Sequence, residues 1–132
     1  MIALDTHVLM WLVTSPEKLS QKAQKLINRE VKSAKPLLVS SISIWEICIL
    51  VKKGRLKLSM DVDAWLEKIE NLPFLQFIPI DNKIAAKSVN LPGKFHDDPA
   101  DRIIVASARE SGAALVTSDQ RIRKYSHIQS VW

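Results

Sequence analysis

Four acidic residues occupy positions from which their side chains could act together on one ligand: Asp5, Glu46, Asp101 and Asp119. Asp5 directly follows the apolar run 2–4, and Asp119 follows the run 115–117 after one residue. The carboxyl ends of parallel strands meet at one edge of a sheet, so both aspartates are expected there. Carboxylate oxygens suit Mg²⁺ or Mn²⁺, whereas zinc usually takes histidine or cysteine. The four acids therefore predict a cation site at which a metal-activated water could attack a phosphate.

Glu46 is the most informative of the four because of the segment that carries it. Positions 42–51 are apolar on nearly every side, so a helix built from them is expected to be mostly buried. A buried carboxylate must reach solvent, pair with a positive charge or bind a metal, because leaving it unpaired is costly. The alternative is a capping box, since Ser43 stands three residues before Glu46.

The segment 96–102, His-Asp-Asp-Pro-Ala-Asp-Arg, concentrates three carboxylates within five positions. Such a concentration is repulsive unless cations offset it, which favours a cation site at Asp101. The alternative is that Asp101 is a capping-box partner in the first turn of a helix that starts at Asp98 and Pro99. Asp5 and Asp119 have a similar alternative, because aspartate is a favoured helix N-cap.

The elements that must position these residues follow from periodicity and helix-end signals. Short apolar runs predict strands at 2–4, 36–40, 74–80, 114–117 and 128–131, the last at an edge. Helical spacing and capping residues predict helices over about 7–13, 20–31, 41–53, 62–69, 82–88 and 99–111. Strands that alternate with helices are typical of a parallel sheet covered on both faces. We therefore expect one domain over residues 1–132, with an α/β fold: a three-layer α/β/α sandwich around a mostly parallel sheet.

The composition indicates which kind of binding partner and which cellular compartment to expect. A formal net charge of +5 favours an anionic partner, such as nucleic acid or an acidic protein segment. No apolar stretch approaches the roughly 20 residues that span a bilayer, and Asp5 and His7 interrupt the apolar N-terminus. The single cysteine, Cys48, is expected to be buried and cannot form an internal disulfide. These features predict a soluble, cytoplasmic protein.

Four motifs stand out in the sequence: Asp5-Thr6-His7 with Trp11, Ser43-Ile44-Trp45-Glu46-Ile47, His96 with Asp98-Pro99-Ala100-Asp101-Arg102, and Leu115-Val116-Thr117-Ser118-Asp119. Together they resemble the PIN-domain family, and specifically the VapC-type toxins of bacterial toxin-antitoxin pairs. They follow one another in the family's order, and their combination is specific although each motif alone would be weak.

The resemblance implies a five-stranded PIN-like sandwich and an endoribonuclease that depends on Mg²⁺ or Mn²⁺. It also implies a homodimer and a small antitoxin whose tail covers the active site. Trp45 falls on an apolar face and is expected to be a core or dimer-interface residue. Thr117 resembles the family's supporting hydroxyl, and His96 and Asp98 would shape the pocket from outside. The resemblance assigns catalysis and metal binding to Asp5, Glu46, Asp101 and Asp119.

One position departs from the family pattern. Some relatives carry a second acid just after the last aspartate, whereas Gln120 and Arg121 stand there in this chain, which argues against a fully occupied second metal site. Arg102 and Arg121 are the basic residues predicted to contact RNA phosphates or an acidic antitoxin terminus. Arg123 and Lys124 fit a solvated basic face better.

Other functions place aspartates at strand ends as well. A haloacid-dehalogenase-type phosphatase would want a second aspartate where His7 stands, and a receiver domain would want paired acids and a late lysine. No glycine-rich nucleotide-binding loop occurs. The non-enzyme alternative is an RNA- or protein-binding module whose acids only cap helices and pair with arginines. It predicts that Asp5→Asn and Asp101→Asn leave every activity intact.

Overall fold

Five short parallel strands form the centre of the molecule in the computed structural model, which describes residues 1–132. They are β1 (Ile2–Leu4), β2 (Leu37–Ser40), β3 (Leu75–Ile78), β4 (Ala114–Val116) and β5 (Ser130–Val131). Their order in the sheet is β3-β2-β1-β4-β5, and every neighbouring pair is parallel. In the central strand, Leu4 pairs with Val39 on one side and Val116 on the other. The predicted α/β class is confirmed, with a sheet that is parallel throughout.

Seven α-helices and one 3₁₀ turn join the strands. They are α1 (Thr6–Thr14), η1 (Pro16–Lys18), α2 (Gln21–Lys32), α3 (Ser41–Lys52), α4 (Val62–Glu70), α5 (Asn82–Val89), α6 (Pro99–Glu110) and α7 (Gln120–Arg123). Most of them begin where a serine or aspartate side chain accepts a backbone N–H of the first turn, as in the caps at Ser20, Asp61 and Asp81. α7 was not predicted, because four residues are too few to show a helical period.

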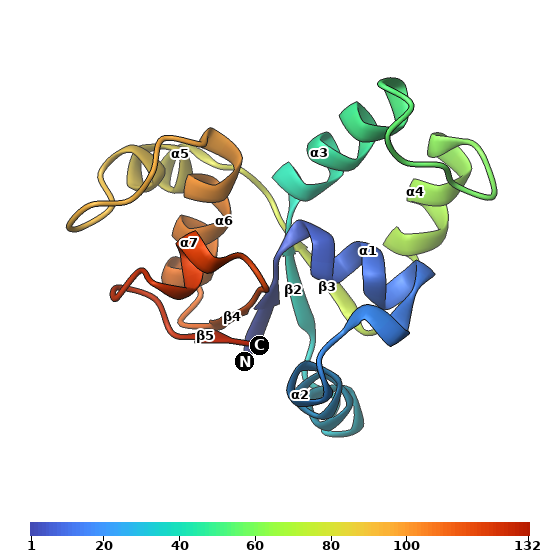
Figure 1. The fold of residues 1–132 in the computed structure, drawn as a ribbon, viewed down its shortest axis with the longest axis horizontal. Helices are drawn as coiled ribbons and strands as arrows, with labels where there is room; N and C mark the ends of the chain where they lie inside the picture. The colour runs from blue at the N-terminus through green and yellow to red at the C-terminus, as the bar shows by residue number, and fades with distance from the viewer.

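The sheet separates two apolar cores, because successive side chains of a strand point to opposite faces. Ile2 and Leu4 of β1 face a core that also contains residues of α1, α2 and α4. Ala3 faces a second core built mainly from α6, α7 and the segment that follows α7. Figure 1 shows α5, α6 and α7 on one side of the strands and α1, α2 and α4 on the other.

Helix α3 has a special place, because it contacts both α1 and α6 and so bridges the two helical layers. Figure 1 shows it above the carboxyl end of β2, from which it directly continues. Its side chains therefore reach the same edge of the sheet as the residues that follow β1 and β4.

Three details differ from the sequence-based expectations. The third and fifth strands are shorter than predicted, ending before Pro79 and beginning only at Ser130. Cys48 is half-buried rather than fully buried, whereas its neighbour Ile47 on α3 lies in the core.

None of the helices combines the length and the apolar character needed to cross a membrane.

Candidate functional site

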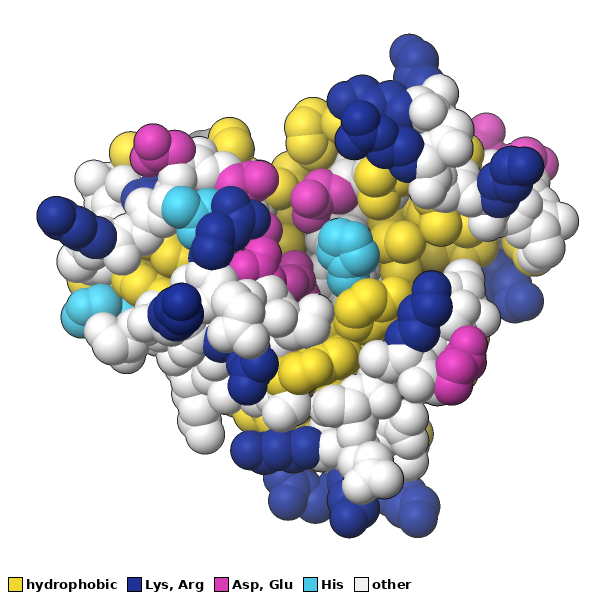
Figure 2. All heavy atoms as spheres, viewed as in Figure 1, with side chains coloured by type: hydrophobic (Ala, Val, Ile, Leu, Met, Phe, Trp, Pro, Cys, Tyr) yellow, Lys and Arg dark blue, Asp and Glu magenta, His cyan; other side chains and the backbone are white.

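A cleft of about 400 Å³ opens at the carboxyl edge of the sheet and collects the predicted acids. Asp5 directly follows β1, Asp119 lies in the turn after β4, Glu46 comes from α3, and Asp101 comes from the first turn of α6. Figure 2 shows acidic side chains gathered in a hollow between two lobes of the molecule, with basic side chains on its rims. Four segments far apart in the chain therefore bring their carboxylates to one place.

Asp5 is 7% exposed and its carboxylate is held on both oxygens. Oδ1 accepts the backbone N–H of Thr6 at 2.8 Å, so Asp5 does cap α1 as the alternative interpretation proposed. Oδ2 accepts the hydroxyl of Thr117 at 2.6 Å, a contact between residues 112 positions apart. Thr117 is fully buried and its Oγ1 also accepts the backbone N–H of Asp119. Thr117 thus ties the end of β1 to the turn that carries Asp119.

Glu46 does not form the capping box that its spacing to Ser43 suggested. α3 begins earlier, with Ser40 as its N-cap, so Ser43 is already inside the helix. Glu46 Oε1 instead accepts the hydroxyl of Thr6 at 2.5 Å, and Thr6 Oγ1 lies 2.8 Å from Ser43 Oγ. Because both hydroxyl residues are buried, this short chain of hydrogen bonds holds the Glu46 carboxylate at the rim of the cleft.

Asp101 does not act as a capping-box partner either. Its backbone N–H is accepted by Oδ1 of Asp98, which caps α6, but its carboxylate points elsewhere. A hydrogen bond of 2.6 Å joins Asp101 Oδ2 to His96 Nε2, and Arg121 donates to the same oxygen at 3.3 Å. Asp101 is 8% exposed, so both partners act on a carboxylate with little access to water.

Crowding and burial set the charge state of the cleft. Desolvation by burial raises the pKa of Asp5, of Glu46 and of Asp101, and neighbouring carboxylates raise each of them further. Hydrogen bonds from Thr117, Thr6 and His96 oppose this rise without cancelling it. The ionised carboxylates of this cleft therefore repel one another, and a bound cation would reduce that repulsion.

Arg121 is the only cation that lines the cleft. Its guanidinium donates to Oδ2 of Asp101 and to Oδ2 of Asp119, each at 3.3 Å. Burial alone would raise the pKa of Asp119, but the hydrogen bonds and charge of Arg121 outweigh it and lower that pKa. The predicted role of Arg121 toward an external anion thus competes with an internal ion pair.

The oxygen-only donor set fits a hard divalent cation such as Mg²⁺ or Mn²⁺. No three acidic, histidine or cysteine side chains of this structure converge closely enough to enclose an ion by themselves. Mg²⁺ does not require that, because it usually keeps several waters and takes one or two carboxylates together with substrate phosphates. The lining carries more carboxylates than its single arginine can pair with, and such an ion would offset that excess of negative charge.

Arg102, predicted to contact RNA phosphates or an antitoxin, forms hydrogen bonds within the protein instead. Four of its N–H groups donate to backbone carbonyls, namely those of Ser88, Val89, Phe95 and His96. These hydrogen bonds join the loop before α6 to the end of α5. Because four of its five N–H donors are engaged, Arg102 is not available to bind an external phosphate with two parallel hydrogen bonds. It thereby positions His96, which holds Asp101.

The sequence interpretation missed Thr6 and Ser43 as members of the site. Thr6 belongs to the motif that begins at Asp5, but nothing in the local pattern shows that its hydroxyl reaches a glutamate 40 positions away. Trp45 was expected in the core or at a dimer interface, and its 58% exposure excludes the core. Of the supporting residues, Thr117 and His96 both contact a cleft acid directly, whereas Asp98 lines the cleft and caps α6.

A family model for the PIN domain matches residues 2–128 of the chain. In amino-acid sequence the chain is similar to Ribonuclease VapC22 of Mycobacterium tuberculosis, with 36% identity over 130 residues. That alignment covers 98% of this chain and 95% of the relative.

Solved structures share the fold at low sequence identity. The VapBC2 complex of Rickettsia felis bound to promoter DNA matches with a TM-score of 0.72 at 18% identity, covering 99% of this chain and 98% of that chain. The DNA-bound VapBC complex of Salmonella typhimurium matches with a TM-score of 0.69 at 17% identity, over 99% and 98% of the two chains. A toxin-antitoxin complex from Klebsiella pneumoniae matches with a TM-score of 0.65 at 19% identity, over 100% and 97%.

Proposed function

The chain belongs to the PIN-domain family, and we propose that it is the ribonuclease toxin of a type II toxin-antitoxin pair, hydrolysing RNA phosphodiester bonds in its acidic cleft. The observation that carries the proposal is the convergence of four carboxylates from four separated segments at the carboxyl edge of the sheet. The proposal treats residues 1–132 as one functional domain, and takes Asp5, Glu46, Asp101 and Asp119 as its catalytic and metal-binding residues.

A divalent cation, Mg²⁺ or Mn²⁺, belongs to this proposal. When bound in the cleft, it would acidify and orient a water and neutralise charge on the phosphate. Arg121 already occupies one oxygen of Asp101 and one of Asp119. The sequence lacks a second acid after Asp119, so we expect one tightly held cation rather than two.

The chain's own residues orient the carboxylates. Thr117 and the α1 backbone hold Asp5, and His96 holds Asp101 from the loop that Arg102 anchors. These partners restrict each carboxylate to one rotamer, so the ligand atoms lie in place before substrate arrives. His96 and Thr117 are in this sense positioning residues, and Arg121 is placed to receive a phosphate if one displaces its carboxylate partners.

Thr6 gives a test of this positioning. Replacing Thr6 by valine removes the hydroxyl that joins Ser43 to Glu46 while keeping the shape of the side chain. We expect RNA cleavage to fall by roughly 10- to 100-fold, the usual cost of losing a side chain that holds a metal-binding residue in place. The loss of buried hydrogen bonds should also lower the free energy of unfolding by about 1–3 kcal/mol.

Thr6→Ser is the matched control, because it retains the hydroxyl. The measurement is the cleavage rate of a labelled RNA, together with the melting temperature of each variant. Normal cleavage by Thr6→Val would mean that Glu46 needs no such support, and a loss of cleavage in Thr6→Ser as great as in Thr6→Val would mean that the hydroxyl is not what matters.

A small antitoxin protein is the expected partner. Three structural neighbours are described as toxin-antitoxin or VapBC complexes, which supports the same arrangement for this chain. An apolar groove of about 520 Å³ between α1 and α4 offers a place for an amphipathic helix, with Leu12, Met60 and Leu72 in its lining. Lys57 and Lys68 line the same groove and would favour acidic side chains on that helix.

A homodimer is part of the proposal as well. Trp45 is 58% exposed and Val89 is 72% exposed, which leaves large apolar side chains in water on α3 and at the end of α5. Tryptophan is enriched in protein–protein interfaces, so Trp45 is the side chain that supports this part of the proposal. Because Trp45 is next to Glu46, dimerisation through it would place two acidic clefts near one another.

The direct test incubates the purified chain, freed of any antitoxin, with a mixed pool of structured RNA. We expect discrete cleavage with Mg²⁺ or Mn²⁺ and none with EDTA, because the carboxylates need a cation to act on phosphate. The binding-module alternative predicts that the RNA is bound but stays intact under every condition. RNA that stays intact in the presence of both metals would contradict the nuclease proposal.

A further inference from the structure

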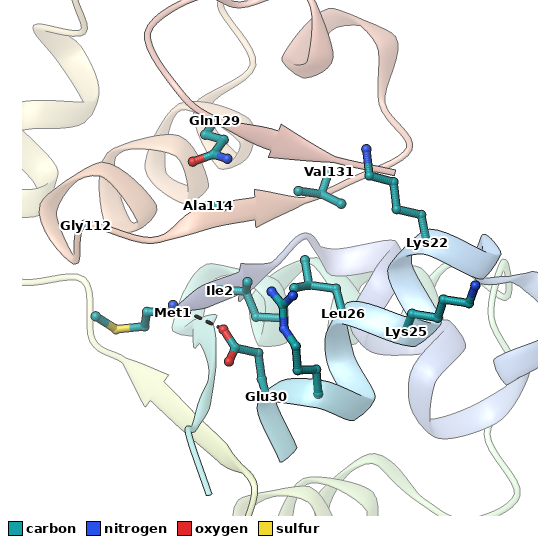
Figure 3. Close-up of a pocket in the computed structure, with 11 residues that line it drawn as sticks. Met1, Ile2, Lys22, Lys25, Leu26, Glu30, Gly112, Ala114, Gln129 and Val131 are labelled. Atoms are coloured by element: carbon teal, nitrogen blue, oxygen red, sulfur yellow. Dashed lines mark ion pairs between the residues drawn. The ribbon is translucent and has the colours of Figure 1, made fainter. Parts of the chain in front are cut away.

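A second cavity, of about 600 Å³, lies at the opposite edge of the sheet from the acidic cleft. Its lining includes Ile2, at the start of β1, and Ala114, at the start of β4, so it opens at the amino ends of the strands. Figure 3 shows α2 forming one wall and β4 and β5 the other, with Lys22 and Lys25 on the α2 side.

The charge of this cavity is strongly positive. Lys22, Lys25 and Arg29 line it from α2, all three are exposed, and none of them takes part in any ion pair of the structure. Its one carboxylate, Glu30, is 4% exposed and already pairs with the Met1 ammonium at 3.2 Å and with Lys35 at 3.9 Å. Three cations are therefore left without a counter-charge around a concave surface.

The spacing of these cations indicates a repeating anion. Lys22, Lys25 and Arg29 are separated by three and then four residues, so they lie along one face of α2 with rises of about 4.5 and 6 Å. Lys32 continues the same row beyond the cavity, and Figure 2 shows basic side chains gathered over α2 at the bottom of the view. A row of this kind suits successive phosphates better than one isolated anion.

The remaining lining suits a nucleotide rather than an acidic peptide. Leu26, Ala114 and Val131 give the cavity an apolar part against which a ribose or base could pack. Gln129 adds an exposed side-chain amide, and such an amide can bind a base edge or a 2′-hydroxyl.

We infer that this basic cavity binds the sugar-phosphate backbone of an RNA, at a site separate from the acidic cleft and on the other edge of the sheet. The inference rests on the proposed function for the identity of the ligand. Together the two sites would let one long RNA be held at the cavity while a distant phosphodiester bond lies in the cleft. A short RNA would bind in the cleft without reaching the cavity.

The test measures RNA binding without cleavage. Fluorescence anisotropy in EDTA follows a labelled stem-loop RNA with a long single-stranded tail, using the full chain and the double variant Lys25→Ala/Arg29→Ala. We expect the variant to bind about tenfold more weakly at low salt. The slope of log K against log salt should fall by roughly 1.4, since each phosphate contact to a single strand contributes about 0.7.

The matched control is Lys83→Ala/Lys87→Ala, which removes the same charge from α5, where both lysines pair with Glu110. This control should bind with nearly the salt slope of the unaltered chain. Equal slopes for the two double variants would overturn the inference, because the effect would then be one of net charge alone. Loss of affinity for a poly-glutamate peptide with unchanged RNA binding would also overturn it, in favour of an acidic protein partner.

A cleavage assay separates this inference from the proposed function. With metal present, the cavity variant should cut an oligonucleotide too short to reach both sites at the normal rate, and cut the long RNA more slowly. If the unaltered chain cuts neither RNA, the proposed function fails, while the anisotropy result still decides the cavity. Should Lys25→Ala/Arg29→Ala melt at a much lower temperature than the unaltered chain, Lys22→Ala/Lys25→Ala provides the same test with two exposed lysines.

Discussion

Replacing Asp101 by asparagine is expected to lower metal-dependent RNA cleavage by at least about a hundredfold. The amide has the shape of the carboxylate but lacks its charge, so it holds a divalent cation poorly and no longer offers Arg121 a charged partner. The fold should be retained, because the cap of α6 uses the backbone N–H of Asp101 and the side chain of Asp98. The measurement is the initial cleavage rate of a labelled structured RNA in Mn²⁺.

Asp63→Asn provides the matched control, because Asp63 is an exposed carboxylate on α4 outside the cleft. It should cut RNA at the normal rate. Asp5→Asn should behave like Asp101→Asn, since Asp5 faces the same cleft. If an identically purified Asp101→Asn protein cut RNA as fast as the unaltered chain, either the site assignment would be wrong or the activity would come from a contaminating nuclease.

Saturating Mn²⁺ is expected to raise the melting temperature of the unaltered chain by roughly 10 °C. An ion present at 100 times its dissociation constant stabilises the folded state by about 2.7 kcal/mol. For a domain of this size, 1 kcal/mol corresponds to roughly 3–5 °C. Asp101→Asn should show a much smaller rise, and Asp63→Asn the full rise. A similar rise in Asp101→Asn would place the ion somewhere other than the cleft.

The same experiment in EDTA tests the repulsion within the cleft. Burial raises the pKa of Asp101, so this carboxyl binds its proton more tightly in the folded than in the unfolded chain. Its contribution to stability therefore decreases as the pH rises from about 4 through the raised pKa, and stays low above it. At pH 7 the metal-free Asp101→Asn protein should melt slightly higher than the unaltered chain, and the difference should shrink toward pH 4. A cooperative loss of folding in this variant would contradict the assignment.

Much of the fold could be predicted because its signals are local. Apolar runs marked the five strands, and capping residues such as Asp61 and Asp81 marked helix starts that the structure confirms. The helix predicted over 99–111 is confirmed as α6, and Gly112 follows it with a φ of +66°, which favours glycine. α7 was missed, because a helix of four residues leaves no period in the sequence.

The location of the acids could also be predicted, but their partners could not. Asp5 and Asp119 follow strands that lie side by side, and a parallel sheet brings such positions to one edge whatever their distance in the chain. The capping boxes that were the alternatives for Glu46 and Asp101 do not form, because local spacing shows only which hydrogen bonds are geometrically available. In the folded chain, Thr6 and His96 offered these carboxylates partners that the spacing alone did not reveal.

The sequence by itself therefore determined the type and order of the elements and the chemistry of four carboxylates at one edge of the sheet. Only the tertiary structure decided which groups those carboxylates contact: Thr117 for Asp5, Thr6 for Glu46, and His96 with Arg121 for Asp101. The tertiary structure also brought Lys22, Lys25 and Arg29 of α2 against the amino edge of the sheet as the wall of a cavity. Secondary structure depends on neighbours along the chain, whereas hydrogen-bond partners and cavities depend on how separate elements pack, and a single sequence does not state that packing.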